Sequence, residues 1–374
     1  MFKRSSRLPR LIVAAFLLSL TWSASPAWAD RVILRNLEIL NNVKVLSLDE
    51  DGVDIEGKGV IGWDQIERGS VGLKQEQFDK FLKDLGGPLF RLRQRLSVGD
   101  YVGLTEQAEA LFPVYAKRSS DTAYLVSQAT MWSRQANGRP AAALEAYFRC
   151  LKMLRDKAGL AGSLPGTRKL AFDAGTGLCP ELEPIFFNVQ EAQKELQPVK
   201  AAAQDLQPPL PQAAFVYVGS LAITAGDMQL AEKSFENLRA DNALVADWRV
   251  IAPAMQSLVG GENDQTIIQL EARVPGMHPF NRSIARYLLG KARTSDSMKA
   301  AVEQGVLDFL YVPAIEGAQR PELSAAALYD AMHALQKAGD VRQAANLRKE
   351  ILANYSGAYF GQRLRDQLNR GEDH

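Results

Sequence analysis

The pattern of apolar and polar residues changes near residue 72. From residue 31 to residue 72, short β-branched and aliphatic runs alternate with turn-forming pairs such as Asn41-Asn42 and Asp51-Gly52. An Asp-Gly pair between two alternating runs is typical of a β-hairpin. We therefore predict a small β-unit of three to five strands over 30–72, with Trp63 anchoring its core or an interface.

After residue 72 the apolar spacing becomes helical. Phe78, Phe81, Leu82 and Leu85 form one apolar face, and similar faces recur as far as Leu335. Strand signals are almost absent from this region. The sequence therefore predicts a mainly α protein with a helical domain over 73–374. A Gly- and Pro-rich insertion is expected at about 156–184.

Turn glycines recur along the helical region. Gly226-Asp227 is followed by Ala231, Phe235 and Leu238, at offsets of 5, 9 and 12 from the glycine. Related residues occupy the same offsets after three other glycines, Gly99, Gly138 and Gly339. Glycine permits a tight turn between antiparallel helices, aspartate caps the second helix, and a small residue lets the two helices cross closely.

This pattern resembles the tetratricopeptide repeat, a helix-turn-helix unit that stacks into a superhelix with a concave ligand groove. The resemblance implies a tetratricopeptide-like superhelix of α-α hairpins after the β-unit. The family's small residue seven positions before the turn glycine occurs only as Gly219, and the turn glycines are unevenly spaced. We therefore expect irregular hairpins. The whole arrangement also resembles secreted bacterial proteins, a likeness that implies no activity.

The same resemblance implies where a partner would bind. In the tetratricopeptide family, the first helix of each unit faces its ligand with the residues six and ten positions before the turn glycine. In the last unit these are His333 and Tyr329, with Gln336 on the same side, and in the unit before it they include Ser220. These four residues are thus implied to bind a partner. The alternative for Tyr329 and His333 is a contact with the next helix.

Residues 1–29 predict export of the chain. A basic start, from Lys3 to Arg10, precedes the apolar run Leu11–Leu20, and the small-residue box Ala27-Trp28-Ala29 lies directly before Asp30. This order is typical of a secretory signal peptide, and the run is too short for a bilayer span. We therefore expect a periplasmic or secreted protein that has no stable membrane insertion once the signal is removed.

Composition excludes several kinds of partner and cofactor. The 374 residues are 47% hydrophobic and 23% charged, which is typical of a globular protein. Without the four cations of the signal peptide the formal charge is 40 − 43 = −3, so no attraction to nucleic acid is expected. Two cysteines and three histidines leave few ligands for a metal centre. We predict no cofactor and no metal site.

Motifs for catalysis or nucleotide binding are weak. The stretch 57–62 fits G-x-G-x-x-G, but it continues into a strand-like run instead of a helix, which favours a hairpin turn. The acidic residues around Gly52 do not form a calcium loop, because Lys58 stands where the bidentate glutamate is needed. A G-x-S-x-G elbow is absent from the sequence. We therefore assign no catalytic residues.

These observations favour a non-catalytic protein–protein or peptide interaction module, or scaffold, in the cell envelope. The alternative is an envelope enzyme that acts on cell-wall glycan, with a carboxylate pair such as Glu181 and Glu183 on the helical array. A structural envelope component that assembles through the β-unit is a third hypothesis. Export also predicts a disulfide between Cys150 and Cys179, and the alternative is two separate thiols.

Overall fold

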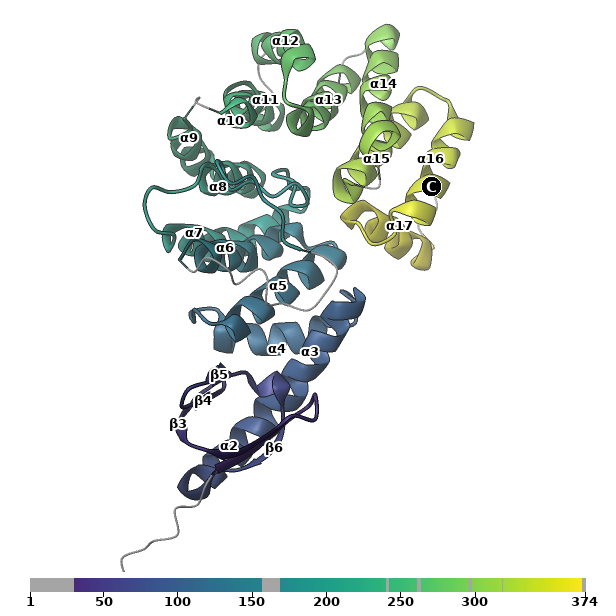
Figure 1. Ribbon diagram of the computed structural model, residues 1–374. Coiled ribbons are helices and arrows are strands. Elements are labelled where there is room, and N and C mark those ends of the chain that lie inside the picture. Colours follow the sequence, from purple (N-terminus) through teal and green to yellow (C-terminus); the bar gives the residue numbers. More distant parts are fainter. Residues whose placement is uncertain are drawn as a thin grey trace, which may run out of the picture. The chain divides into compact units, whose positions relative to one another are not determined.

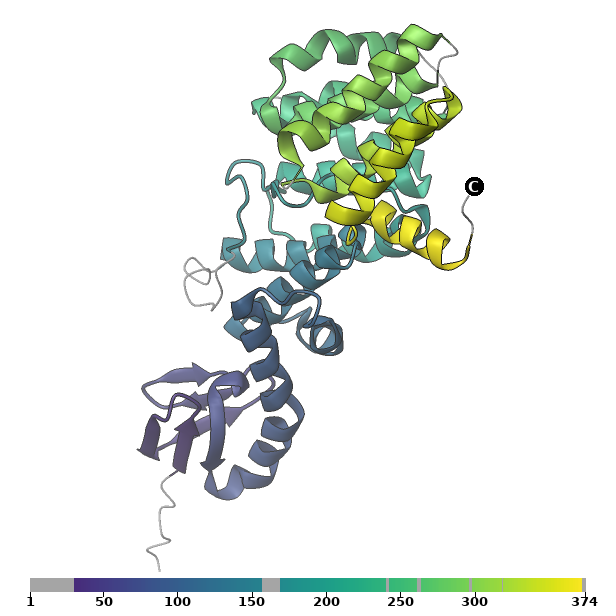
Figure 2. The same ribbon diagram turned by 90° about the vertical axis from the view of Figure 1, so that its right-hand side faces the viewer.

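The computed structural model describes residues 30–156, 169–239, 242–260, 264–295, 298–317 and 319–371. The signal peptide predicted over 1–29 and residues 157–168 of the predicted insertion lie outside the described residues. The chain divides into two compact units, Met1–Phe90 and Arg91–His374 (Figures 1 and 2). The first unit therefore extends beyond residue 72, the predicted end of the β-unit.

The first unit contains two three-stranded antiparallel sheets, with strand orders β2-β1-β6 and β3-β4-β5. The strands are β1 (Asp30–Leu34), β2 (Ile39–Val43), β3 (Val45–Leu48), β4 (Val53–Ile55), β5 (Gly59–Ile61) and β6 (Ile66–Ser70). The small antiparallel β-unit is confirmed, with one strand more than the sequence predicts. Strand β6 escapes prediction because only Ile66 among its residues is buried.

A tight hairpin and one tryptophan organise the β-unit. Gly52 has φ +155°, and a Cβ there would lie 2.2 Å from the carbonyl oxygen of Ile61, so only glycine fits. Trp63 is fully buried against Phe78, and its indole N–H donates to the Asp49 carbonyl at 2.7 Å. The predicted hairpin and the predicted core tryptophan are both confirmed. Phe78 belongs to α2 (Gln75–Phe81), which is why the unit extends past its strands.

The rest of the described chain is mainly helical. A π-helical stretch, Leu82–Gly86, follows α2. Within the part of the chain that the structure describes, no helix is long and apolar enough to cross a bilayer. The further helices are α3 (Gly87–Val98), α4 (Thr105–Tyr115), α5 (Asp121–Ala136), α6 (Pro140–Asp156), α7 (Val189–Gln204), α8 (Gln212–Ala225), α9 (Met228–Glu236), α10 (Ala243–Ala246), α11 (Trp248–Gly260), α12 (Asp264–Arg273), α13 (Pro279–Thr294), α14 (Lys299–Glu316), α15 (Pro321–Lys337), α16 (Val341–Asn354) and α17 (Tyr359–Asn369).

The four repeat turns share one backbone geometry. Each turn glycine has a φ between +65° and +88°, and the N–H of the residue after it donates to the carbonyl five residues earlier in the preceding helix. The aspartates Asp227 and Asp340 then cap α9 and α16 by accepting from the N–H three residues on. The turn chemistry inferred from the sequence is therefore confirmed.

Close helix crossings depend on glycines that face aromatic rings. A Cβ on Gly219 in α8 would lie 2.7 Å from Cζ of Phe235 in α9. The ring of Phe235 lies parallel to that of Trp248, at a centroid distance of 6.2 Å. Gly290 and Phe309 make the same contact between α13 and α14. The later pair lacks the repeat turn, so its glycine–aromatic contact is visible only in the structure.

Replacing Gly219 by alanine should lower the free energy of unfolding by about 1–3 kcal/mol, because the added methyl group overpacks the contact with Phe235. Urea unfolding measures this change. Gly260→Ala is the matched control, since a Cβ there meets nothing within 4 Å. Equal stabilities for the two variants would contradict the close crossing of α8 and α9.

Candidate interaction site of the helical unit

An extended segment, Thr176–Phe187, lies among the helices of the second unit without forming a helix or a strand itself. Most of it is buried, and only its middle, at Pro180 and Glu181, and its last residue are more accessible. Its first part overlaps the insertion predicted at about 156–184, and the segment continues to Phe187, beyond the predicted end. A buried segment without regular structure needs partners for its main-chain N–H and C=O groups, since an unpaired buried group is costly.

Hydroxyl groups from α6 and α8 supply several of these partners. Tyr147 donates to the Gly177 carbonyl, and Tyr217 donates to the Leu182 carbonyl at 2.8 Å. Further along α8, Thr224 donates to the Phe186 carbonyl at 3.1 Å. Burial raises the pKa of Tyr147 and Tyr217 well above the usual value, so both hydroxyls stay protonated and act as donors.

The far end of the segment contacts the C-terminal helices. The Glu183 carboxylate accepts a hydrogen bond from the Leu323 N–H at the start of α15, at 3.0 Å. The Phe187 ring lies 5.6 Å from Tyr287 of α13 and 5.5 Å from Phe360 of α17. The segment therefore joins helices that are far apart in the sequence.

A cleft of about 750 Å³ opens beside the accessible middle of the segment. Pro180 and Glu181 form one side, and residues of α5, α13, α14 and α15 form the others. Arg320 is buried in its wall, 4% exposed, with Nε 2.6 Å from a Glu316 oxygen and the guanidinium 4.5 Å from the centre of the Phe280 ring. The volume is in the range of ligand sites in proteins.

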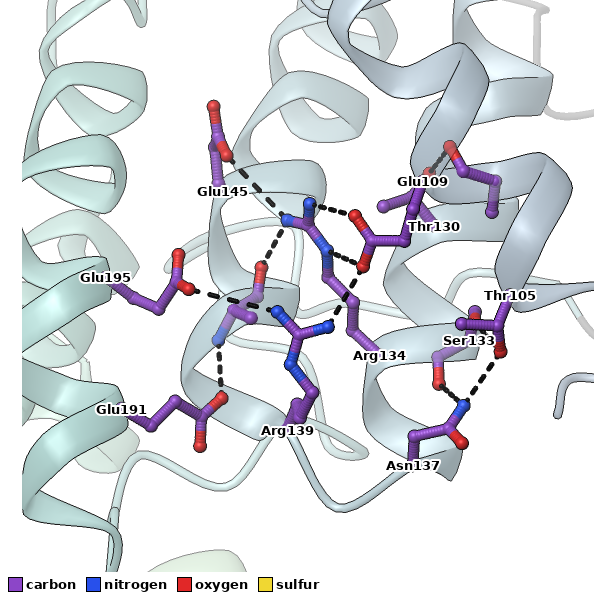
Figure 3. A network of polar contacts seen from close by, with 12 residues as sticks. Thr105, Glu109, Thr130, Ser133, Arg134, Asn137, Arg139, Glu145, Glu191 and Glu195 are labelled. Carbon is purple, nitrogen blue, oxygen red and sulfur yellow. Dashed lines mark hydrogen bonds and ion pairs between the residues drawn. The ribbon is translucent and has the colours of Figure 1, made fainter.

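A partly buried polar network holds α4 to α7 together (Figure 3). Arg134 of α5 forms two hydrogen bonds with Glu109 of α4, at 3.0 and 2.8 Å, and a third with the Ala142 carbonyl of α6. Arg139 donates to the same Glu109 at 3.1 Å and lies 3.9 Å from Glu195 of α7. The hydrogen bond from Arg134 lowers the pKa of Glu109, so its carboxylate stays ionised.

Three glutamates, of which Glu183 and Glu322 are buried and Glu191 is partly buried, each cap a helix in another part of the chain. Glu191 accepts from the Ala142 N–H of α6, Glu183 from the first turn of α15, and Glu322 from the Tyr359 N–H of α17. A carboxylate is stabilised at a helix N-terminus, where main-chain N–H groups lack partners. Burial nevertheless raises the pKa of Glu183 and Glu191 to about 7 and that of Glu322 to about 8.

Such pKa values are those of general acids and bases, but the geometry of these groups is that of helix caps. Glu183 and Glu322 are 7% and 8% exposed, and each is hydrogen-bonded to a main-chain N–H. Glu181, paired with Glu183 in the sequence hypothesis, lies at the cleft while Glu183 is buried. Among the described residues, no group of His, Cys, Asp and Glu could hold a metal ion.

The four residues assigned to partner binding do not form one surface. Ser220 is fully buried in α8, four residues before the Thr224 that binds the extended segment. Tyr329 is 7% exposed and stacks on Phe360, with ring centres 4.4 Å apart. His333 and Gln336 are exposed. A partner-binding role remains a prediction, and the structure leaves only His333 and Gln336 accessible for it.

Both cysteines are buried thiols in the structure. Burial is the main cause that raises the pKa of Cys150, and Cys179 adds to it. A raised pKa keeps the thiol protonated and unreactive. The Cys150–Cys179 disulfide stays a prediction.

Comparisons with family models, with curated proteins and with solved structures each found no match. The class that the fold defines is a mainly helical protein with a small N-terminal antiparallel β-unit. The contacts of the extended segment and the clefts beside it are the features of this fold that bear on function.

The buried glutamates predict a pH dependence of stability. The pKa of Glu322 is raised from 4.5 to about 8 in the folded chain. Its protonated carboxyl therefore contributes fully to the free energy of unfolding below pH 4.5, and this contribution is lost as the pH rises through 8. Glu322→Gln keeps an oxygen for the Tyr359 N–H and removes the charge. We expect the variant to be about 2–4 kcal/mol more stable than the parent at pH 9, and nearly equal at pH 4.5.

Urea unfolding at several pH values between 4.5 and 9 measures this difference. Glu303→Gln serves as the control, because that side chain is 67% exposed and pairs only with Lys299 at the surface. If the free energy of unfolding depends on pH in Glu322→Gln as it does in the parent, Glu322 is not a buried carboxyl with a raised pKa.

Tyr329 and His333 can be separated by mutation. Tyr329→Ala should lower the free energy of unfolding by about 2–4 kcal/mol, because it removes a buried ring from Phe360. His333→Ala should change it by less than about 0.5 kcal/mol, because the imidazole is exposed. Chemical denaturation checks both values. A large loss in His333→Ala would place that residue in the core.

Proposed function

We propose that the protein is a non-catalytic interaction module of the cell envelope, with tetratricopeptide-like hairpins as the scaffold for a protein or peptide partner. One observation carries this proposal: α6 and α8 hold a stretch of peptide without regular secondary structure, the chain's own segment Thr176–Phe187, by its main-chain carbonyls. Tyr147, Tyr217 and Thr224 recognise main-chain carbonyls, which every peptide offers. Binding of extended chains through the main chain is a recurrent mode of peptide recognition.

The tetratricopeptide resemblance points to the same face of the helices. Ser220, which it implies as ligand-facing, lies one turn before Thr224, and residues four apart share a helix face. Gln135 of α5, three residues before its turn glycine, donates to the Glu181 carbonyl. These contacts of Thr224 and Gln135 support a ligand-facing role for this side of the helices, and we propose that a separate partner binds beside the segment.

The cleft next to Pro180 and Glu181 is the proposed place for this partner. Its lining combines apolar surface from Phe280 and three prolines with polar groups of Gln135 and Gln319. This mixture suits a short peptide segment, which needs apolar contact and main-chain hydrogen bonds.

Export to the periplasm or outside the cell is part of the proposal. It rests on the basic start, the apolar run and the Ala27-Trp28-Ala29 box of the sequence. In that compartment, a module that recognises other envelope proteins needs no nucleotide or cofactor.

Site-specific photocrosslinking in the native host tests the proposal. A benzophenone amino acid is placed at Gln319 in the cleft, at His333 on the face implied by the resemblance, and at Arg342, an exposed control on α16. We expect an adduct of one defined mass from Gln319 or His333 and none from Arg342. An adduct from Gln319 should be weakened about tenfold or more by Phe280→Ala, which removes the aromatic wall.

Equal adducts at all three positions, or none at any of them, would contradict the proposed module. A second experiment tests the alternative function: the purified protein is incubated with cell-wall glycan. Release of soluble fragments would show that the alternative, an envelope enzyme, is correct.

A further inference from the structure

A second pocket, of about 380 Å³, lies where α6 and α9 end and α8 begins. The proposed function does not use it, and it lies at the other end of the extended segment from Phe187. Its lining includes Leu151 and Arg155 from the end of α6, Leu210 and Pro211 before α8, Arg239 after α9, and Phe172.

The pocket carries positive charge. Arg155 and Arg239 are its only charged lining residues, and both side chains are exposed. Arg155 donates to the Pro209 carbonyl at 3.0 Å, which leaves the rest of its guanidinium available. Within the ranges that the structure describes, neither arginine forms an ion pair with a carboxylate. Two unpaired guanidinium groups at one pocket attract an anion and can bind a carboxylate in a bidentate manner.

The floor of the pocket is apolar and closely packed. Leu151 is buried, and a Cβ on Gly177 would lie 3.0 Å from Cβ of Pro211 and 3.4 Å from a Leu151 methyl group. The Gln212 side chain accepts a hydrogen bond from the Arg239 N–H at 2.7 Å, which fixes the backbone of Arg239 against the start of α8. Arg155 and Arg239 therefore project from a closely packed region, and these contacts hold its backbone in place.

A further contact fixes the remaining side of the pocket. The Asp173 carboxylate accepts from both the N–H and the hydroxyl of Thr176, each at 2.7 Å, so the loop that lines the pocket has one defined conformation. These bonds hold the Asp173 side chain against its own loop, and its carboxylate keeps its negative charge. Asp173 is not among the residues that line the pocket, whose charged lining residues are the two arginines.

We propose that this pocket binds a small organic acid, in which a carboxylate is joined to an apolar body. The carboxylate pairs with Arg155 and Arg239, and the body lies on Leu151, Leu210 and Pro211 beside the Phe172 ring. Inorganic phosphate carries charge but has no apolar surface, so it can pair with the arginines but leaves the apolar lining residues without a contact. The volume of the pocket suits a molecule of this size. This site is independent of the proposed interaction function.

Isothermal titration calorimetry on the purified full exported chain tests the site at low ionic strength, where charge pairing is least screened. The probes are 3-phenylpropanoate, with an aromatic body, and hexanoate, with an aliphatic one. The matched neutral probe is 3-phenylpropanamide. We expect at least one acid to bind, and the amide to bind at least about tenfold more weakly, because it lacks the charge that the arginines recognise.

Variants locate the binding. Arg239→Gln and Arg155→Gln should each weaken binding of the acid by about tenfold, and Arg342→Gln, an exposed arginine on α16, should leave it unchanged. Both pocket side chains are exposed, so the variants should keep the parent's melting temperature. Equal binding of acid and amide, no binding of either acid, or equally tight binding of inorganic phosphate would each overturn the proposal.

Discussion

The helical unit depends on satisfying the main chain of one buried, irregular segment. Residues 176–187 have no helix or sheet to pair their N–H and C=O groups, and leaving such groups unpaired inside a protein costs about 1–3 kcal/mol each. Tyr147, Tyr217 and Thr224 provide hydroxyl donors from α6 and α8. Because Glu183 and Phe187 then contact α15, α13 and α17, the segment links the early hairpins with the late ones.

The charged groups of the helical unit are arranged by the same packing of distant parts of the chain. Helix N-termini that are buried against other helices cannot be capped by water, and glutamates from distant parts of the chain take that role at α6, α15 and α17. In the network of Figure 3, four glutamates surround Arg134 and Arg139. Glu109 accepts bonds from both arginines and has a lowered pKa, whereas Glu191 bonds only to a main-chain N–H and has a raised one. The Arg134 hydrogen bond outweighs burial at Glu109, whereas at Glu191 burial raises the pKa by more than the main-chain hydrogen bond lowers it.

Local features of the fold could be predicted from the sequence, and long-range ones could not. The turns at Gly226 and Gly339 are determined by a glycine, a capping aspartate and helical spacing within about fifteen residues, so the sequence indicates them directly. Thr176–Phe187 looks like a loop because its partners lie 30 to 140 residues away. Tyr147, nine residues after Gly138, occupies the aromatic position of a repeat unit, but that spacing does not indicate that its hydroxyl binds Gly177. The buried Arg320 and Glu322 carry no sequence signal, since charged residues beside a proline usually indicate an exposed helix start.

The placement of Ser220 and Tyr329 shows how an inserted segment changes the meaning of a repeat pattern. In a regular array, the inner helix face is left open for a ligand. Here the inserted segment covers the face of α8 that holds Ser220, and α17 covers Tyr329 through Phe360. The same residue positions thus become core, and the recognition that we propose is assigned to the places where the segment meets solvent. Those places are the cleft at Pro180 and the arginine-lined pocket near Gly177, where the packing of the segment itself shapes the walls.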